Sequence, residues 1–249
     1  SAFRESGDPA LPAARQQAEK AIERALPEIL LKAITDVPVD SQVTLGELLR
    51  TDRDVLEWFQ QIHYKAAGKT GYFTPDLSGL TVRYTLRLYP DLITPLIDHQ
   101  RPYRPELRLD WEPSGPFTGI VIYIPGELPE INSPRAVRLE PCLLPKIYDQ
   151  ELNLLAAFYM VDPEVLLTQG AVRYTDSLDE KTYQDRVGYY PMRVIARGIF
   201  GSRPTDPVIP LEWANKIRSS RDLQRLIAQG KVVIVIEPPQ DTPAASTGP

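Results

Sequence analysis

The stretch Gly119-Ile120-Val121-Ile122-Tyr123-Ile124 is a continuous apolar run within a chain of 249 residues. A short run of this kind is typical of a strand that is buried on both faces. A similar run, Val232-Val233-Ile234-Val235-Ile236, follows Gly230 near the end of the sequence. The first run predicts a buried strand at the beginning of a C-terminal module, and the second predicts the final strand of that module.

Short strands and short helices are expected between these two runs. Asp162-Pro163-Glu164 supplies an N-cap residue, a proline at the first helical position and an acid in the first turn, which predicts a helix that ends before Gly170. Three further strands are predicted at Leu143–Tyr148, Leu152–Tyr159 and Met192–Gly198, and two further helices at Glu212–Arg218 and Arg221–Ala228. The module therefore mixes both kinds of element.

The N-terminal part of the sequence has the periodicity of helices. Apolar residues recur at helical spacing from Pro9 to Ile34, which predicts an amphipathic helix that Pro27 should bend or divide. Thr44 and Glu47 have the spacing of a capping box and predict the start of a second helix. A second apolar stripe follows at Val55, Leu56, Phe59 and Ile62.

Two stretches after the helices, His63–Phe73 and Leu80–Tyr89, are predicted to form a hairpin around the turn residues 76–79. In the second stretch apolar and polar residues alternate, as in a half-buried strand. The sequence thus predicts an α+β fold, with mixed sheets, short helices, an N-terminal amphipathic helix packed on a sheet, and proline-rich connections.

Four regions are expected along the chain. A helix and hairpin module covers residues 9–89, a proline-rich connection covers 90–116, and an α+β module covers 117–237. Residues 238–249 consist mainly of small and polar residues and of proline, which predicts a disordered tail.

Composition narrows the classes of function. The formal net charge is −5, which argues against nucleic acid as the main partner, because binding to a duplex requires several Lys and Arg contacts to phosphates. Cys142 is the only cysteine, so an internal disulfide is excluded. Residues 1–8 lack the features of a signal peptide, so either the protein is cytosolic or a signal precedes residue 1. No apolar stretch approaches the roughly 20 residues that cross a bilayer.

Few residues qualify as catalytic. A cysteine nucleophile needs a neighbouring base, and the candidates for Cys142 are His63 and His99, of which His99 is expected to be exposed. Two histidines and one cysteine at wide spacing match no zinc pattern. Asp110 and Glu112 flank Trp111 and offer a weak signal for the acid and base of a glycosidase. The sequence therefore predicts no catalytic residue, no metal site and no cofactor.

Basic residues cluster in one part of this acidic chain. Lys181 is followed by four arginines, Arg186, Arg193, Arg197 and Arg203, in a stretch with few acids. A solvated surface is the ordinary interpretation of such a cluster. The alternative is a patch that contacts an acidic neighbouring subunit or anionic lipid headgroups, and the four arginines are the candidate partner contacts.

The order of several short motifs resembles a known family. These motifs are Phe117–Ile122, Pro141–Asp149, Gly170, Arg186–Gly188, Pro191–Gly198, Thr205–Ile209 and Val232–Ile236. Together they resemble envelope proteins of diderm bacteria that are related to flagellar basal-disk lipoproteins and flagellar ring-assembly proteins. The resemblance implies a periplasmic or lipid-anchored, non-catalytic protein, and several members of that family build rings around the flagellar motor. Tyr123-Ile124-Pro125-Gly126 departs from the family, which has an acidic residue and an arginine there.

Two functions follow as hypotheses. In the first, the chain is a periplasmic, non-enzymatic structural or assembly protein that is associated with the flagellar motor, with any signal peptide or lipid anchor lying before residue 1. Its partners would be other envelope or motor proteins or further copies of itself. In the second, it is a glycan-binding envelope protein or an enzyme of the cell wall, in which Tyr103 and Trp111 line a cleft with paired carboxylates.

Overall fold

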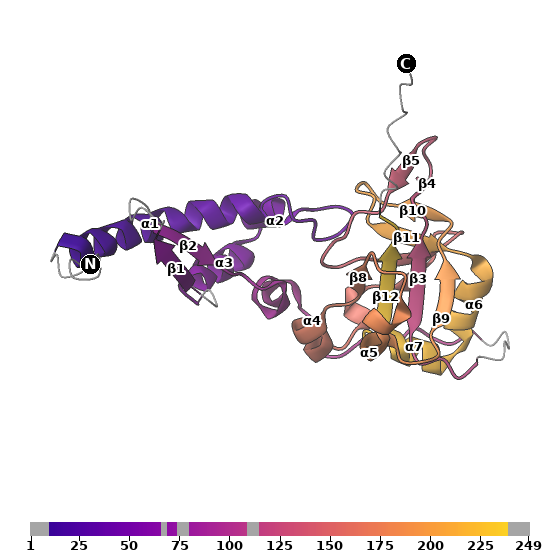
Figure 1. Ribbon diagram of the computed structural model, residues 1–249. Helices are drawn as coiled ribbons and strands as arrows, with labels where there is room; N and C mark the ends of the chain where they lie inside the picture. The colour runs from indigo at the N-terminus through magenta and orange to yellow at the C-terminus, as the bar shows by residue number, and fades with distance from the viewer. Residues whose placement is uncertain (1–9, 66–68, 74–79, 109–114, 239–249) are drawn as a thin grey trace, which may run out of the picture. The chain divides into compact units, whose positions relative to one another are not determined.

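The computed structural model describes residues 10–65, 69–73, 80–108 and 115–238, and Figure 1 shows the course of the chain. Two compact units are present. The first combines residues up to 37 with residues 44–96, and the second combines residues 38–43 with residues from 97 onward. The predicted tail lies outside the described residues from position 239 on.

The first unit consists of three helices and an antiparallel hairpin among its described residues. The helices are α1 (Ala10–Ile34), α2 (Leu45–Thr51) and α3 (Arg53–Lys65), and the hairpin joins β1 (Lys69–Phe73) to β2 (Leu80–Tyr84). Two short helical turns, η2 (Leu88–Leu92) and η3 (Thr94–Leu96), complete it. Helix α1 packs against β2, so the predicted contact between the N-terminal helix and a sheet is confirmed.

Local sequence signals explain these helices. The hydroxyl of Thr44 accepts a hydrogen bond from the Glu47 N–H, and the Glu47 carboxylate accepts one from the Thr44 N–H at 2.7 Å, so the predicted capping box is confirmed. Buried side chains of α1 and α3 form the core of the unit: Leu26, Leu30, Ile34, Val55, Phe59 and Ile62. Helix α1 continues through Pro27, so the prediction that Pro27 could divide it is wrong.

The second unit is built around a parallel sheet in the order β8–β12–β3–β9. Its strands are β8 (Arg173–Thr175), β12 (Val232–Ile236), β3 (Ile120–Ile124) and β9 (Met192–Ile195). A second sheet has the order β10–β11–β6–β7, with strands Gly198–Phe200, Asp206–Ile209, Ile147–Asp149 and Leu154–Ala156. Strands β4 (Glu127–Pro129) and β5 (Ala136–Arg138) form a separate hairpin.

Both faces of β3 and β12 are covered, as the apolar sequence of β3 predicts. On one face Val121, Val233 and Val235 contact Tyr183 and Val187. The other face belongs to the main core, which includes buried residues of α6 (Leu211–Ser219) and α7 (Arg221–Ala228). Figure 1 shows β3 and β12 side by side in the middle of this unit. The strands predicted at residues 119–124 and 232–236 are therefore confirmed, and the first is buried on both faces as predicted.

Short helices connect the strands of this sheet along the chain. Helix α4 (Pro163–Gln169) begins at the N-cap Asp162, whose carboxylate accepts a hydrogen bond from the Glu164 N–H at 2.9 Å. The 3-10 turn η4 (Phe158–Met160) precedes it, and η5 (Glu180–Thr182) precedes α5 (Gln184–Val187). A Cβ atom at Gly119 would lie 2.5 Å from the Cβ of Val187, so glycine at this position allows α5 to approach β3.

Several predicted boundaries are wrong. Residues 63–65 continue α3 and do not begin a strand, because the apolar stripe of α3 extends to Ile62 and carries the helix on by one turn. Residues 143–146 precede β6, and residues 157–159 follow β7. The predicted strand 192–198 is two strands, β9 and β10, in different sheets. Within the described residues, no helix is long and apolar enough to cross a bilayer.

Backbone hydrogen bonds attach residues 38–43 to the rest of the second unit. The N–H groups of Leu143 and Leu144 donate to the carbonyl oxygens of Pro38 and Val39 at 3.0 and 2.7 Å. Lys146 forms an ion pair with Asp40 at 3.3 Å. Buried Asp206 lies nearby and accepts hydrogen bonds from the Lys146 N–H and the Thr205 hydroxyl, and burial raises the pKa of its carboxyl group.

Cys142 is buried in this region, and its thiol should be inert. Burial raises the pKa of Cys142 to about 12, so the reactive thiolate is scarce near neutral pH. We expect Cys142→Ala to lower the free energy of unfolding by only about 1 kcal/mol, because a small side chain leaves a small cavity. A thiol reagent at pH 8 should label the native protein at least 100-fold more slowly than the denatured protein, and equal rates would contradict this account.

Candidate functional site

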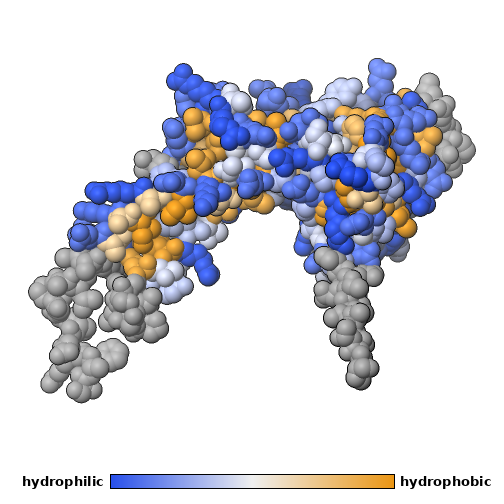
Figure 2. All heavy atoms as spheres, turned by 90° about the horizontal axis from the view of Figure 1, so that it is seen from above, coloured by the Kyte–Doolittle hydropathy of each residue, from blue (hydrophilic) through white to orange (hydrophobic). Residues whose placement is uncertain are grey.

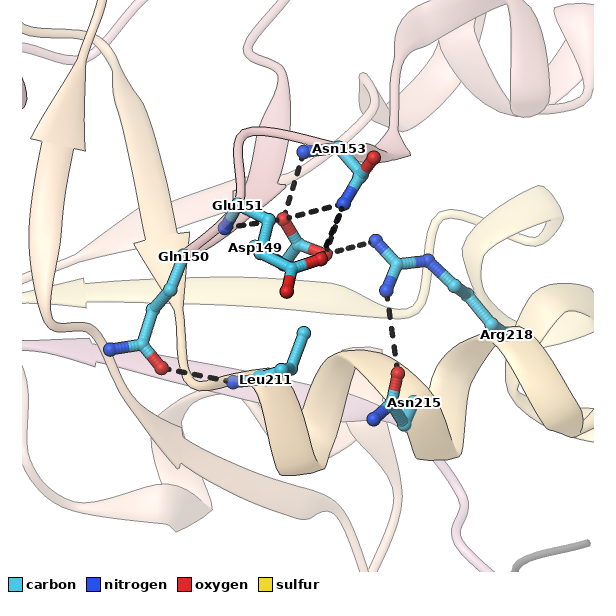
Figure 3. Close-up of polar contacts among 7 residues, drawn as sticks. All are labelled: Asp149, Gln150, Glu151, Asn153, Leu211, Asn215 and Arg218. Carbon is cyan, nitrogen blue, oxygen red and sulfur yellow. Dashed lines mark hydrogen bonds and ion pairs between the residues drawn. The ribbon is translucent and has the colours of Figure 1, made fainter. Parts of the chain in front are cut away.

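The second unit contains a buried ion pair between Asp149, the last residue of β6, and Arg218 in the last turn of α6 (Figure 3). Asp149 is fully buried, and the Arg218 side chain is only 12% exposed. The same carboxylate accepts hydrogen bonds from the backbone N–H groups of Glu151 and Asn153, at 2.9 and 2.8 Å. The Asn153 side-chain amide donates to it as well, at 3.0 Å. Every lone pair of this buried charge is thereby engaged.

The turn that follows β6 surrounds the Asp149 carboxylate. Residues 149–153 fold back so that the Leu152 N–H donates to the Asp149 carbonyl oxygen at 2.9 Å, and Leu152 adopts the left-handed conformation with φ 62°. Burial by itself would raise the pKa of Asp149, but the hydrogen bonds from Arg218 and Asn153 outweigh burial and hold the pKa below its usual value. Asp149 is therefore a carboxylate, and it fixes Arg218.

The position of Arg218 determines the position of two further elements. Its carbonyl oxygen accepts hydrogen bonds from the Arg108 N–H at 3.1 Å and from the Gln224 side chain at 3.4 Å. Helix α6 ends at Ser220, whose hydroxyl caps α7 by accepting from the Leu223 N–H at 3.3 Å. Arg218 thus links the ion pair, through its own backbone, to the segment 101–108 and to helix α7.

A cleft of about 730 Å³ lies between these two elements. One wall is the segment 103–107, and the other is α7. The apolar lining consists of Pro105, Leu107, Leu155, Met160, Ile227 and Ala228. Tyr103 lines the cleft with a side chain that is 56% exposed, and its ring meets that of Tyr159 edge-on with 6.0 Å between the centroids.

The polar lining of the cleft carries more positive than negative charge. Its charged residues are Arg104, Glu106, Arg221, Asp222 and Arg225, and Gln224 is neutral. Arg225 forms an ion pair with Asp222 at 2.6 Å. Among the residues that the structure describes, neither Arg104 nor Arg221 has an ion-pair partner. Both guanidinium groups are therefore available to an anionic group that enters the cleft.

The open edge of the parallel sheet is a second candidate surface. Strand β9 pairs only with β3 among the described strands, and the N–H groups of Met192 and Ala196 donate to β3. Because backbone groups alternate along a strand, those of Arg193 and Ile195 face the open side. Tyr189, Tyr190 and Ile195 are more than half exposed. We call Tyr189, Tyr190, Arg193 and Ile195 the β9 edge surface. On the face drawn in Figure 2, hydrophobic residues reach the surface in patches between hydrophilic ones.

A polar network holds Arg193 within this surface. Its guanidinium binds both carboxylate oxygens of Glu180 at 2.5 Å, and the Tyr123 hydroxyl donates to the same carboxylate at 3.1 Å. The hydrogen bonds from Arg193 lower the pKa of Glu180. Burial raises the pKa of Tyr123, and the Tyr183 hydroxyl adds to this effect. The network ties the β9 edge to β3 and η5.

The structure places the four predicted arginines differently from one another. Arg186 is buried, and its guanidinium donates to the carbonyl oxygens of Gln169 and Gly170, so it supports the end of α4 inside the protein. Arg193 is half exposed in the network described above. Arg197 is exposed and Arg203 is half-buried. Of the four predicted contact residues, Arg193, Arg197 and Arg203 are therefore the ones that solvent reaches.

The predicted catalytic candidates do not come together in the part of the chain that the structure describes. His99 is not exposed as expected: its side chain is 14% exposed, and its Nε2 lies 2.8 Å from the Val161 carbonyl oxygen, because residues 97–103 pack along the second unit. His63 belongs to the first unit, in α3. Asp110, Trp111 and Glu112 lie outside the described residues. Among the described residues, no group of three or more His, Cys, Asp or Glu side chains could hold a metal ion.

Sequence reasoning placed Tyr103 in a cleft only as part of the glycan hypothesis, and it missed the other walls of the cleft and the ion pair beside it. The lining comes from residues 103–107, 155–160 and 221–228, which are far apart in the sequence. The one available signal was the sequence Asp149-Gln150-Glu151 between two predicted strands, because aspartate at the end of a strand often binds the backbone of the turn that follows. Nothing in the sequence pairs Asp149 with Arg218.

Comparison with known proteins covers both units. Residues 4–95 match a family model of the N-terminal domain of Treponema pallidum Tp0624, and residues 119–238 match a model of the second domain of the same protein. No curated protein matches the chain. The two parts of the chain are thus similar to two domains of one spirochete protein. Neither matching description mentions a flagellar disk or ring.

The ion pair of Asp149 and Arg218 should make a large contribution to stability. Removing one partner of a buried pair leaves an uncompensated charge, so we expect Arg218→Met to lower the free energy of unfolding by about 3–5 kcal/mol. Asp149→Asn should also destabilise the protein at pH 7. Because folding lowers the pKa of Asp149, its contribution is complete above the unfolded pKa of about 3.9 and is lost as the pH falls through the folded pKa.

The measurement is denaturant unfolding between pH 7 and pH 3. The difference between the wild type and Asp149→Asn should shrink over this range. Asp185→Asn is the matched control, since Asp185 pairs with Arg173 at the surface and should contribute at most about 1 kcal/mol. A difference for Asp149→Asn no larger than that of the control would contradict the role of the ion pair.

Proposed function

We propose that this chain is a non-enzymatic structural or assembly protein of the cell envelope that acts by binding other proteins. The observation that carries this proposal is the β9 edge surface. It combines an open strand edge with two tyrosines and an isoleucine that are 52–73% exposed. Exposed apolar residues beside unpaired backbone groups are typical of sites where another chain adds a strand.

The charged residues of the second unit support a structural role. Asp149 and Glu180 are the carboxylates whose pKa values the fold lowers by pairing them with Arg218 and Arg193. Both groups are held as anions and hold other elements in place. A general acid or base that works near neutral pH instead requires a pKa close to that pH. For these two groups the arrangement favours a structural role over general acid or base catalysis.

The envelope is the proposed location of this scaffold. The similarity to two domains of a Treponema pallidum protein supports a role in a diderm bacterium, and the motif order described above supports a periplasmic protein. An association with the flagellar motor is the narrower form of the proposal, and it rests on the motif order alone. The partners in this proposal are other envelope or motor proteins, or further copies of the chain.

A glycan-binding protein or a cell-wall enzyme is the second candidate. The observation that favours it is the cleft, because Tyr103 lines it together with Glu106 and Asp222. An aromatic ring beside carboxylates is a common arrangement in sites that bind sugars. Because Asp222 is ion-paired with Arg225, Asp222 is less suited to act as an acid or base. The glycan candidate therefore ranks below the scaffold.

Charge placed on the β9 edge should abolish partner binding. We expect Ile195→Lys to reduce the envelope proteins cross-linked to the tagged full chain in intact cells by at least tenfold, because a lysine on an exposed edge prevents another strand from pairing there. Ile195 is 52% exposed, so the thermal midpoint should stay within about 2 °C. Mass spectrometry of the cross-linked material measures the effect.

Leu88→Lys is the matched control, since Leu88 is 46% exposed and lies in the first unit. It should retain the partners of the wild type. Equal capture by the wild type and Ile195→Lys would remove the β9 edge from the proposal. Release of soluble fragments from purified cell wall by the chain would favour the second candidate instead.

A further inference from the structure

We propose that the cleft between residues 103–107 and α7 binds a short acidic peptide in an extended conformation. This site is separate from the β9 edge surface, and the proposal does not depend on the function proposed above. Nothing in the match to the Treponema pallidum domains assigns a ligand to this region. Three features of the cleft lead to this inference: its floor, its charge and its wall.

The apolar floor of the cleft can bind one or two apolar side chains of a ligand. Leu155, Met160 and Ile227 are 4–6% exposed and belong to the main core, so they form a fixed apolar surface at the bottom of the cleft. A volume of about 730 Å³ falls in the range of clefts that take ligands of a few hundred daltons. A short peptide segment fits this size, and burial of an apolar side chain against the floor would favour its binding.

The charge of the rim selects an acidic ligand. Arg104 and Arg221 have no ion-pair partner among the described residues, whereas the third arginine, Arg225, is neutralised by Asp222. Guanidinium groups bind carboxylates through two parallel hydrogen bonds. Arg104 lies on the segment wall and Arg221 at the start of α7, so the two groups come from opposite walls of the cleft. A ligand with carboxylates on both sides of an apolar residue would pair with both Arg104 and Arg221.

The wall favours a peptide over a sugar. Segment 103–107 belongs to no helix or sheet, and its ends are fixed by the hydrogen bonds of the Tyr103 N–H to the Tyr159 carbonyl oxygen and of the Arg108 N–H to the Arg218 carbonyl oxygen. Within the described structure, the N–H groups of Arg104, Glu106 and Leu107 have no hydrogen-bond partner. Backbone N–H groups that are not used within the described structure can pair with the backbone of an extended peptide, as in strand addition.

The test uses the full chain and a fluorescent, end-capped peptide of alternating glutamate and leucine. Fluorescence anisotropy should show saturable binding, and the same peptide with lysine in place of glutamate should bind at least tenfold more weakly. The double variant Arg104→Ser/Arg221→Ser should also lose at least tenfold in affinity. Ala228→Trp keeps both arginines but fills the cleft from the end of α7, and it should reduce binding to a similar extent.

The control is Arg135→Ser/Arg173→Ser, which removes the same charge from surface ion pairs outside the cleft and should bind like the wild type. Inorganic phosphate and oligomers of N-acetylglucosamine serve as competitors. The proposal is overturned if the double variant at the cleft binds like the control. Displacement by phosphate at the same concentration as an unlabelled peptide would instead identify a simple anion site. Displacement by the oligosaccharide would identify a glycan site, and either result would overturn the assignment to a peptide.

Discussion

The second unit depends on one buried interaction, the binding of the Asp149 carboxylate by Arg218, Asn153 and the backbone of the turn that follows β6. A buried carboxylate without partners would cost several kcal/mol, so the turn and the end of α6 must adopt the geometry that satisfies it. The Arg218 carbonyl oxygen accepts hydrogen bonds from Arg108 and Gln224. Ser220, two residues later in the chain, caps the start of α7. The cleft therefore has the shape that this single charge requires.

Local signals in the sequence were sufficient for much of the fold. The apolar run of β3 predicted a strand covered on both faces, the run of β12 predicted the final strand, and Thr44 with Glu47 predicted a helix start; the structure confirms all three. Such local signals do not predict which distant segments of the chain lie side by side. No pattern shows that residues 38–43 lie beside Leu143 and Leu144, or that Arg186 is buried against the end of α4. Both depend on backbone carbonyl groups, which every residue has and which no sequence pattern distinguishes.

The two candidate sites also differ in how far the sequence predicted them. The motif 191–198 was singled out from the sequence, and it contains the β9 edge with Arg193 and Ile195. Apart from Tyr103, the lining of the cleft was missed because three distant segments build it, and Arg104 and Arg221, which have no ion-pair partner among the described residues, are ordinary surface residues in the sequence. A strand edge and a cleft in one unit would let the chain contact two partners at once. Such a chain could act as a linker between components of an envelope assembly, which is the kind of role that the proposed function requires.

The central claim is that the ion pair of Asp149 with Arg218 positions the cleft. Hydrogen–deuterium exchange, resolved along the chain in the Arg218→Met variant and in the wild type, tests it most directly. The account predicts that amides of residues 101–108 and of α7 exchange at least tenfold faster in the variant, which corresponds to about 1.4 kcal/mol of lost protection, while amides of β3 and β12 keep their relative order as the slowest. Unchanged exchange in residues 101–108 and α7 would show that the cleft keeps its shape without this ion pair, and would contradict the account.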